Sequence, residues 1–126
     1  MKNKAILINV VERTVTEIFV DGLDDMYAAM NVDLVTIATG IDDVNDIFVD
    51  DEGLLKGPEH FFFYEGAHQP FAGNGLVLGK DEEGESISTT LTLEEVTSKV
   101  QFLNRSEALR KAKEIEKNLI AGNGLN

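Results

Sequence analysis

The chain has 126 residues, which suits one domain with a single hydrophobic core. It contains no cysteine, so disulfides, thiolate nucleophiles and thiolate metal ligands are excluded. Its 23 acidic and 11 basic residues give a net charge of −12, which opposes direct binding to nucleic acids.

The first 30 residues predict two strands followed by a short helix. Residues 5–10 and 14–20 are rich in β-branched side chains, with Glu12 and Arg13 between them, so they predict a hairpin of two strands. A short helix is predicted over residues 23–30, because apolar side chains recur there at helical spacing. Those side chains are Leu23, Met26, Tyr27 and Met30.

Four further strands and two helices are predicted after that helix. The strands are residues 32–39, 46–50, 61–64 and 76–78. Thr92 and Glu95 have the spacing of a capping box, and Val96, Val100 and Leu103 continue the helix that it begins. Ser106 is predicted to cap a second helix, which Gly122 ends. Its apolar stripe is Leu109, Ala112, Ile115 and Leu119.

This order of elements predicts the α+β class. We expect an antiparallel or mixed sheet of about six strands, with one short helix after the first hairpin and two helices at the C-terminal end. Residues 1–103 form the α+β domain. Residues 104–126 form a basic amphipathic helix that packs on this domain or on a partner subunit.

Charge is divided unevenly between these two parts. Residues 1–98 carry five basic and twenty acidic side chains, whereas residues 99–126 carry six basic and three acidic ones. The acidic part favours solubility, and the basic end can attract it within one chain or between chains. No run of about 20 apolar residues and no secretory leader pattern occurs, so we expect a cytoplasmic protein without a membrane partner.

Catalytic and metal-binding motifs are sparse. His60 and His68 are the only histidines, and their spacing matches no familiar metal site even with Glu59 and Glu65 nearby. Counted from Asp43, the acidic segment has Phe48 and Leu54 at the positions where a calcium loop needs glycine and glutamate. We therefore expect no metal, no cofactor and no catalytic residue, and an enzyme only if His60 or His68 serves it.

The aromatic run Phe61–Tyr64 is the sharpest feature, since a strand with these residues is apolar on both faces. It is either a core strand with a dimer contact, or a stacking platform or patch for a partner. Arg105 and Arg110 could add phosphate contacts. The candidate ligand- or partner-binding residues are therefore Phe61, Phe63, Tyr64, His68, Phe71, Arg105 and Arg110.

Four short motifs follow one another along the chain: Val-Asp-Leu-Val at 32–35, Phe-Val-Asp-Asp-Glu-Gly-Leu-Leu-Lys at 48–56, His-Gln-Pro-Phe-Ala-Gly-Asn-Gly-Leu-Val-Leu-Gly at 68–79 and Leu-Thr-Leu-Glu-Glu-Val at 91–96. Together they resemble a domain-of-unknown-function family common in bacteriophages, plasmids and other mobile elements. The resemblance covers residues 4–103 and leaves the last helix outside. It implies an origin in a mobile element and brings no activity with it.

Three functions follow as hypotheses. The first is a non-catalytic protein of a phage or mobile element that binds a host or defence protein through its acidic surface and aromatic patch. The second is a binder, or sponge, of a small ligand such as a signalling nucleotide. The third is an enzyme that uses His60 or His68. A homo-oligomer is expected, because an exposed aromatic strand and a basic helix would both need cover.

Overall fold

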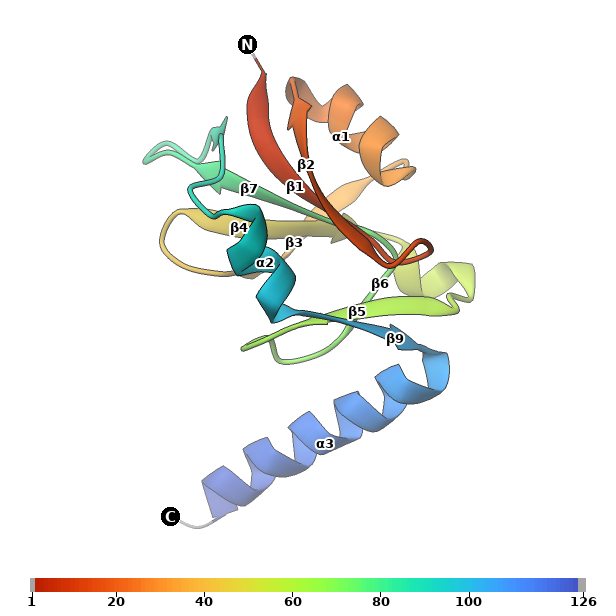
Figure 1. Cartoon of the computed structure of the whole chain (residues 1–126). Helices are drawn as coiled ribbons and strands as arrows, with labels where there is room; N and C mark the ends of the chain where they lie inside the picture. The colour runs from red at the N-terminus through yellow and green to blue at the C-terminus, as the bar shows by residue number, and fades with distance from the viewer. Residues whose placement is uncertain (1, 125–126) are drawn as a thin grey trace.

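The structure is a computed structural model that describes residues 2–124 and the side chains of residues 2–119. Two antiparallel sheets form the body of the molecule (Figure 1). The larger sheet has the order β2 (Thr14–Val20), β1 (Asn3–Asn9), β7 (Gly75–Lys80), β4 (Asn45–Asp50) and β3 (Val35–Gly40), and β8 (Ser86–Ile87) pairs with β7. The smaller sheet has the order β6 (Phe71–Ala72), β5 (His60–Tyr64) and β9 (Val100–Asn104). The predicted α+β class is confirmed.

The predicted hairpin is β1 and β2, whose register runs from Asn3 opposite Val20 to Asn9 opposite Thr14. Its turn is held by the Asn9 side chain, whose Oδ1 accepts hydrogen bonds from the backbone N–H groups of Val11 (3.1 Å) and Glu12 (3.0 Å). Asparagine is favoured in turns for this kind of local bond. The hairpin therefore follows from short-range sequence signals.

Successive side chains of a strand point to opposite faces of its sheet. The central strands of the larger sheet have consecutive apolar residues, so both of its faces are apolar. On one face, Ala5 packs with Leu76 and Leu78 against Met26 and Met30 of helix α1 (Gly22–Met30). On the other face, Ile6 and Ile8 pack with Ile47 and Val77 against the smaller sheet. The helix α1 and the smaller sheet thus cover opposite faces of the larger one.

The smaller sheet contains the largest difference from the sequence prediction. The capping box of Thr92 and Glu95 is confirmed, but helix α2 (Leu93–Lys99) ends at Lys99. The predicted continuation through Val100 and Leu103 is wrong, because residues 100–104 form strand β9 and pair with β5. In β9, Leu103 lies opposite Phe61. Pairing with the aromatic strand overrides the helical spacing in this segment.

Helix α3 (Arg105–Gly124) extends away from the body beyond its first turns (Figure 1). Ala108 is buried against Phe61, Ala72 and Leu103, which fixes the start of the helix. The predicted cap at Ser106 is wrong. The Asn104 side chain accepts from the Glu107 N–H (2.8 Å), and the Glu107 carboxylate accepts from the Asn104 N–H (2.9 Å). Asn104 is therefore the cap.

Within the part of the chain that the structure describes, no helix combines the length and the apolar character needed to cross a membrane.

Candidate functional site

The aromatic run faces the interior. Phe61, Phe62 and Tyr64 are buried, and so is Phe71, whose ring centroid lies 5.5 Å from that of Phe62. Phe63 is half-buried, with the Lys111 Nζ 4.7 Å from its ring centroid. Burial raises the pKa of the Tyr64 phenol, and the nearby carboxylates of Glu95, Asp42 and Glu65 raise it further. These rings are therefore core within one chain rather than an open stacking surface.

The other candidate residues lie apart from one another. His68 is exposed in the loop between β5 and β6. On α3, Arg105 lies 3.7 Å from the Glu59 carboxylate, and the Arg110 guanidinium donates to Ser106 Oγ at 3.3 Å. The seven candidates thus do not form one site, and only Phe71 lines the main cleft.

His60 lies at a smaller hollow. It lines a space of about 210 Å³ together with Lys56, Glu59 and Asn74. His60 itself is exposed. Among the side chains described, no three His, Asp or Glu residues are grouped so that they could hold a metal ion.

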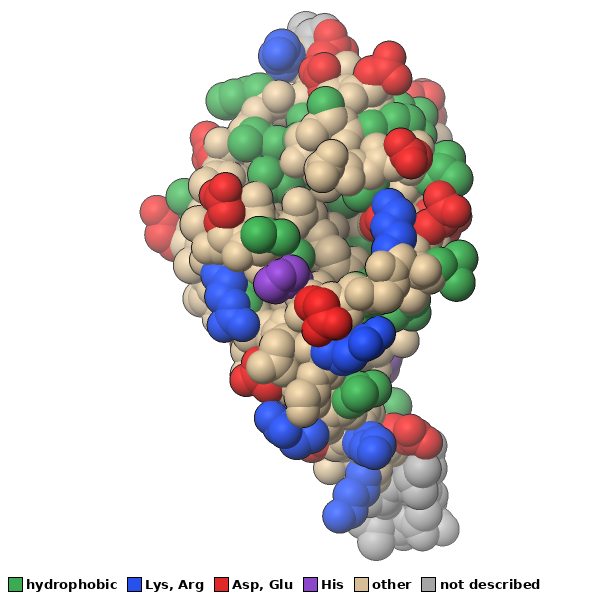
Figure 2. All heavy atoms as spheres, turned by 90° about the vertical axis from the view of Figure 1, so that its right-hand side faces the viewer, with side chains coloured by type: hydrophobic (Ala, Val, Ile, Leu, Met, Phe, Trp, Pro, Cys, Tyr) green, Lys and Arg blue, Asp and Glu red, His purple; other side chains and the backbone are tan. Residues whose placement is uncertain are grey.

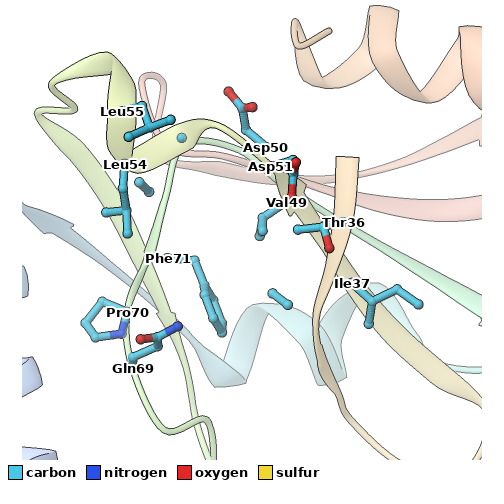
Figure 3. Close-up of a pocket in the computed structure, with 13 residues that line it drawn as sticks. Thr36, Ile37, Val49, Asp50, Asp51, Leu54, Leu55, Gln69, Pro70 and Phe71 are labelled. Carbon is cyan, nitrogen blue, oxygen red and sulfur yellow. The ribbon is translucent and has the colours of Figure 1, made fainter. Parts of the chain in front are cut away.

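The main cleft has a volume of about 450 Å³ and lies between the two sheets (Figure 3). Val49 of β4 and Phe71 of β6 are buried at its floor. Thr36 of β3 points into it from one side, with Leu54 and Pro70 on the opposite side (Figure 3). The two sheets therefore build an apolar space that neither could form alone.

Leu54 and Leu55 border this cleft from η1 (Gly53–Lys56) and are the most exposed large apolar side chains described, at 73% and 84%. Their segment is held close to β6 by Gly53, where an added Cβ would lie only 2.9 Å from the Ala72 carbonyl oxygen. A larger residue at position 53 would push η1 away from β6. The close approach at Gly53 thus sets the position of the two leucines.

Neither leucine was predicted from the sequence as a site residue. A signal was present, since Leu54 and Leu55 are adjacent apolar residues between the Asp-Glu-Gly turn at 51–53 and Lys-Gly-Pro at 56–58. A short segment between turn-forming residues offers little surface to cover two consecutive apolar side chains. The sequence alone did not show which of them would stay exposed.

Carboxylates give the same end of the cleft a negative charge. The Asp50 carboxylate, only 6% exposed, accepts hydrogen bonds from the Glu52 N–H (2.9 Å) and from Lys56 Nζ (2.7 Å). The bond to Asp50 raises the pKa of Lys56 and keeps this lysine charged. Asp51 also lines the cleft and is exposed, as is Asp33 before β3. One lysine therefore faces several carboxylates at this end.

The far end of β3 is fixed by a buried asparagine. The Asn45 side chain donates to the Asp42 carboxylate (3.1 Å) and to Thr90 Oγ1 (2.8 Å), and it accepts from Thr89 Oγ1 (2.6 Å). Partial burial alone would raise the pKa of Asp42, but hydrogen bonds from Asn45 and Val44 outweigh it and lower this pKa. This network holds the loop between β3 and β4, and with it the end of β3, against residues 89–90.

A family model described as a domain of unknown function, DUF3846, matches residues 1–101. No curated protein and no solved structure shows significant similarity to the chain. The matched residues include both leucines and the whole cleft, whereas α3 lies outside them.

Proposed function

The chain belongs to the DUF3846 family of domains of unknown function, and we propose that it is a non-catalytic protein that binds another protein through the cleft between its two sheets. The observation that carries this proposal is the pair Leu54 and Leu55, exposed beside an apolar floor. Exposed apolar side chains that border a concave apolar surface are typical of interaction sites.

Charge supports a protein partner with a basic surface. Asp51 and Glu52 precede the leucines in the sequence, and Asp33 is near enough to act on the charge of Lys56 beside Leu55. These carboxylates would attract such a partner and speed its encounter with the cleft. The aromatic patch of the original hypothesis is replaced by these leucines, because the rings pack inside the chain. The resemblance to families of mobile elements supports a host or defence component as the partner.

A lysate capture experiment tests this proposal. The tagged chain is compared with the double variant Leu54→Asp, Leu55→Asp and with Leu109→Asp, a matched control because Leu109 is also exposed but lies on α3. We expect a protein that the natural chain and the control retain at physiological salt, and that the double variant loses. Quantitative mass spectrometry measures the retention.

Two results would contradict the proposal. One is the capture of no protein at either low or physiological salt. The other is equal capture by the natural chain and the double variant, which would place the binding surface elsewhere. Circular dichroism of the double variant checks its folding, which we expect to be unchanged because both leucines are exposed.

A further inference from the structure

Strand β3 is an edge of the larger sheet, and its pairing leaves main-chain groups available. It pairs with β4, with Val35 opposite Asp50 and Thr36 opposite Val49. The Asp51 N–H donates to the Leu34 carbonyl (3.1 Å), so Leu34 directs its main-chain groups toward β4. Because antiparallel ladders alternate, Thr36 does the same, whereas Val35 and Ile37 direct their N–H and C=O groups outward.

The two edges of this sheet differ in how they are protected. At the opposite edge, β2 is contacted by helix α2 and contains Glu17. In contrast, β3 has the sequence Val-Thr-Ile-Ala-Thr-Gly, without charge or proline, and its register shifts only after Ile37. Natural sheet edges are usually protected by charges, prolines, bulges or covering elements. Residues 35–37 therefore form an unprotected edge with a regular ladder.

The unprotected edge lies beside the cleft. The Thr36 side chain points into the cleft and the Ile37 side chain points away from it (Figure 3). A strand added next to β3 would continue the sheet, and its alternate side chains would project on the same face as Thr36. Those side chains would reach the cleft opening near Leu54 and Leu55. Main-chain bonds and side-chain pockets would then act together, as in other cases of strand addition.

Charge selects among possible occupants of this edge. Asp33 precedes β3 and Asp42 and Asp43 follow it, all three exposed, and Asp51 lies in the cleft. A second copy that paired through its own β3 would bring the same carboxylates together, and like charges repel. A segment with lysine or arginine residues would instead be attracted at both ends of the strand.

We infer that β3 accepts an extended segment of a partner protein, with alternating apolar side chains and flanking basic residues, as an additional strand of the larger sheet. This inference rests on the proposed function, since the apolar side chains of the added strand would occupy the same cleft. It adds the binding mode and the chemistry of the segment.

A random peptide library with segments of about ten residues, long enough to span β3, is the probe. Peptides selected on the natural chain are expected to be basic and to lose affinity as salt rises, because screening weakens their attraction to the carboxylates. Amide hydrogen exchange is then measured with and without the peptide. Binding should slow exchange at Val35 and Ile37, whose N–H groups gain partners.

N-methylation of the peptide separates strand addition from other binding. Methyl groups on the amides that face β3 should weaken binding about tenfold or more, because each removes a hydrogen bond. Methyl groups on the intervening amides should leave the affinity nearly unchanged. The two peptides have the same composition, so each is the matched control for the other.

The outcomes distinguish this inference from the function on which it rests. Peptides that bind, lose affinity for Leu54→Asp, Leu55→Asp, and leave Val35 and Ile37 unprotected would overturn strand addition while supporting the cleft as a binding site. No selected peptide, or equal loss of affinity with both methylation patterns, would also overturn it. Slow exchange at Val35 and Ile37 in the peptide-free chain that depends on protein concentration would assign the edge to a second copy instead.

Discussion

At the scale of single residues, the contact between Phe62 and Gly75 joins the two sheets. Phe62 of β5 is completely buried, and Gly75 of β7 lies against the end of its ring. A Cβ at position 75 would lie 2.5 Å from Phe62 Cζ. The phenylalanine run predicted a buried strand, but its contact with Gly75 was not predictable, because nothing local to either residue shows that the two sheets meet there.

Gly75→Ala is expected to destabilise the protein by about 1–3 kcal/mol, because the added methyl group overpacks the junction between the sheets. Urea unfolding gives the free energy change. The matched experiment repeats the substitution in a Phe62→Leu background, where the shorter side chain leaves room for the methyl group. We expect a smaller cost there, and an equal cost in both backgrounds would show that the ring is not the cause.

At the scale of elements, local signals predicted most of the fold. The hairpin, α1, β4, β5 and the start of α2 all carry turn, cap or periodicity signals within their own sequences. Strand β9 does not, because Val96, Val100 and Leu103 also fit one face of a helix. The short strands β6 and β8 contain only two residues each, too few to show a period. These elements depend on partners that are distant in the chain.

The candidate site was less predictable than the fold. Its floor and its border come from β4, η1 and β6, and the sequence prediction included only the first of these as an element. The seven candidate residues were chosen for aromatic or charged character. Most of them are buried in the core or paired with a neighbouring side chain, so they are not available to a ligand. Leu54 and Leu55 carry no chemistry of their own. Their exposure, which defines the site, becomes visible only once η1 is placed.

Asn104→Ala is expected to destabilise the protein by about 1 kcal/mol, because it removes the side-chain cap of α3. Ser106→Ala is the matched control. Ser106 was predicted from sequence as the cap, but its hydroxyl accepts only an exposed bond from Arg110, so its removal should have little effect. Thermal unfolding followed by far-UV circular dichroism compares the two variants. An equal or larger effect of Ser106→Ala would contradict the assigned cap.

At the scale of the whole molecule, acidic and basic residues are segregated. The net charge is −12, but basic side chains gather at the end of the molecule that α3 forms (Figure 2). Among the side chains that the structure describes, two carboxylates are both nearly buried and paired with a lysine, Asp46 with Lys80 and Asp50 with Lys56. The unbalanced acidic charge therefore opposes folding by self-repulsion.

The midpoint of urea unfolding at pH 7 is expected to rise between about 10 mM and 150 mM sodium chloride, as the Debye length falls from about 30 to 8 Å. The control is the same pair of measurements near pH 4.4, the isoelectric point, where net repulsion vanishes. Salt should then have little effect. A midpoint that does not rise at neutral pH, or that rises equally at both pH values, would show that self-repulsion is not the cause.

Helix α2, strand β9 and helix α3 follow one another without an intervening loop, since Lys99 is followed by Val100 and Asn104 by Arg105. A pulling force applied along α3 would therefore act directly on β9, because no flexible linker lies between them. Because β9 is the outermost strand of the smaller sheet, it can peel from β5 while the larger sheet keeps all its pairings. Tension on the C-terminal helix would thus open the molecule stepwise, beginning at the aromatic strand.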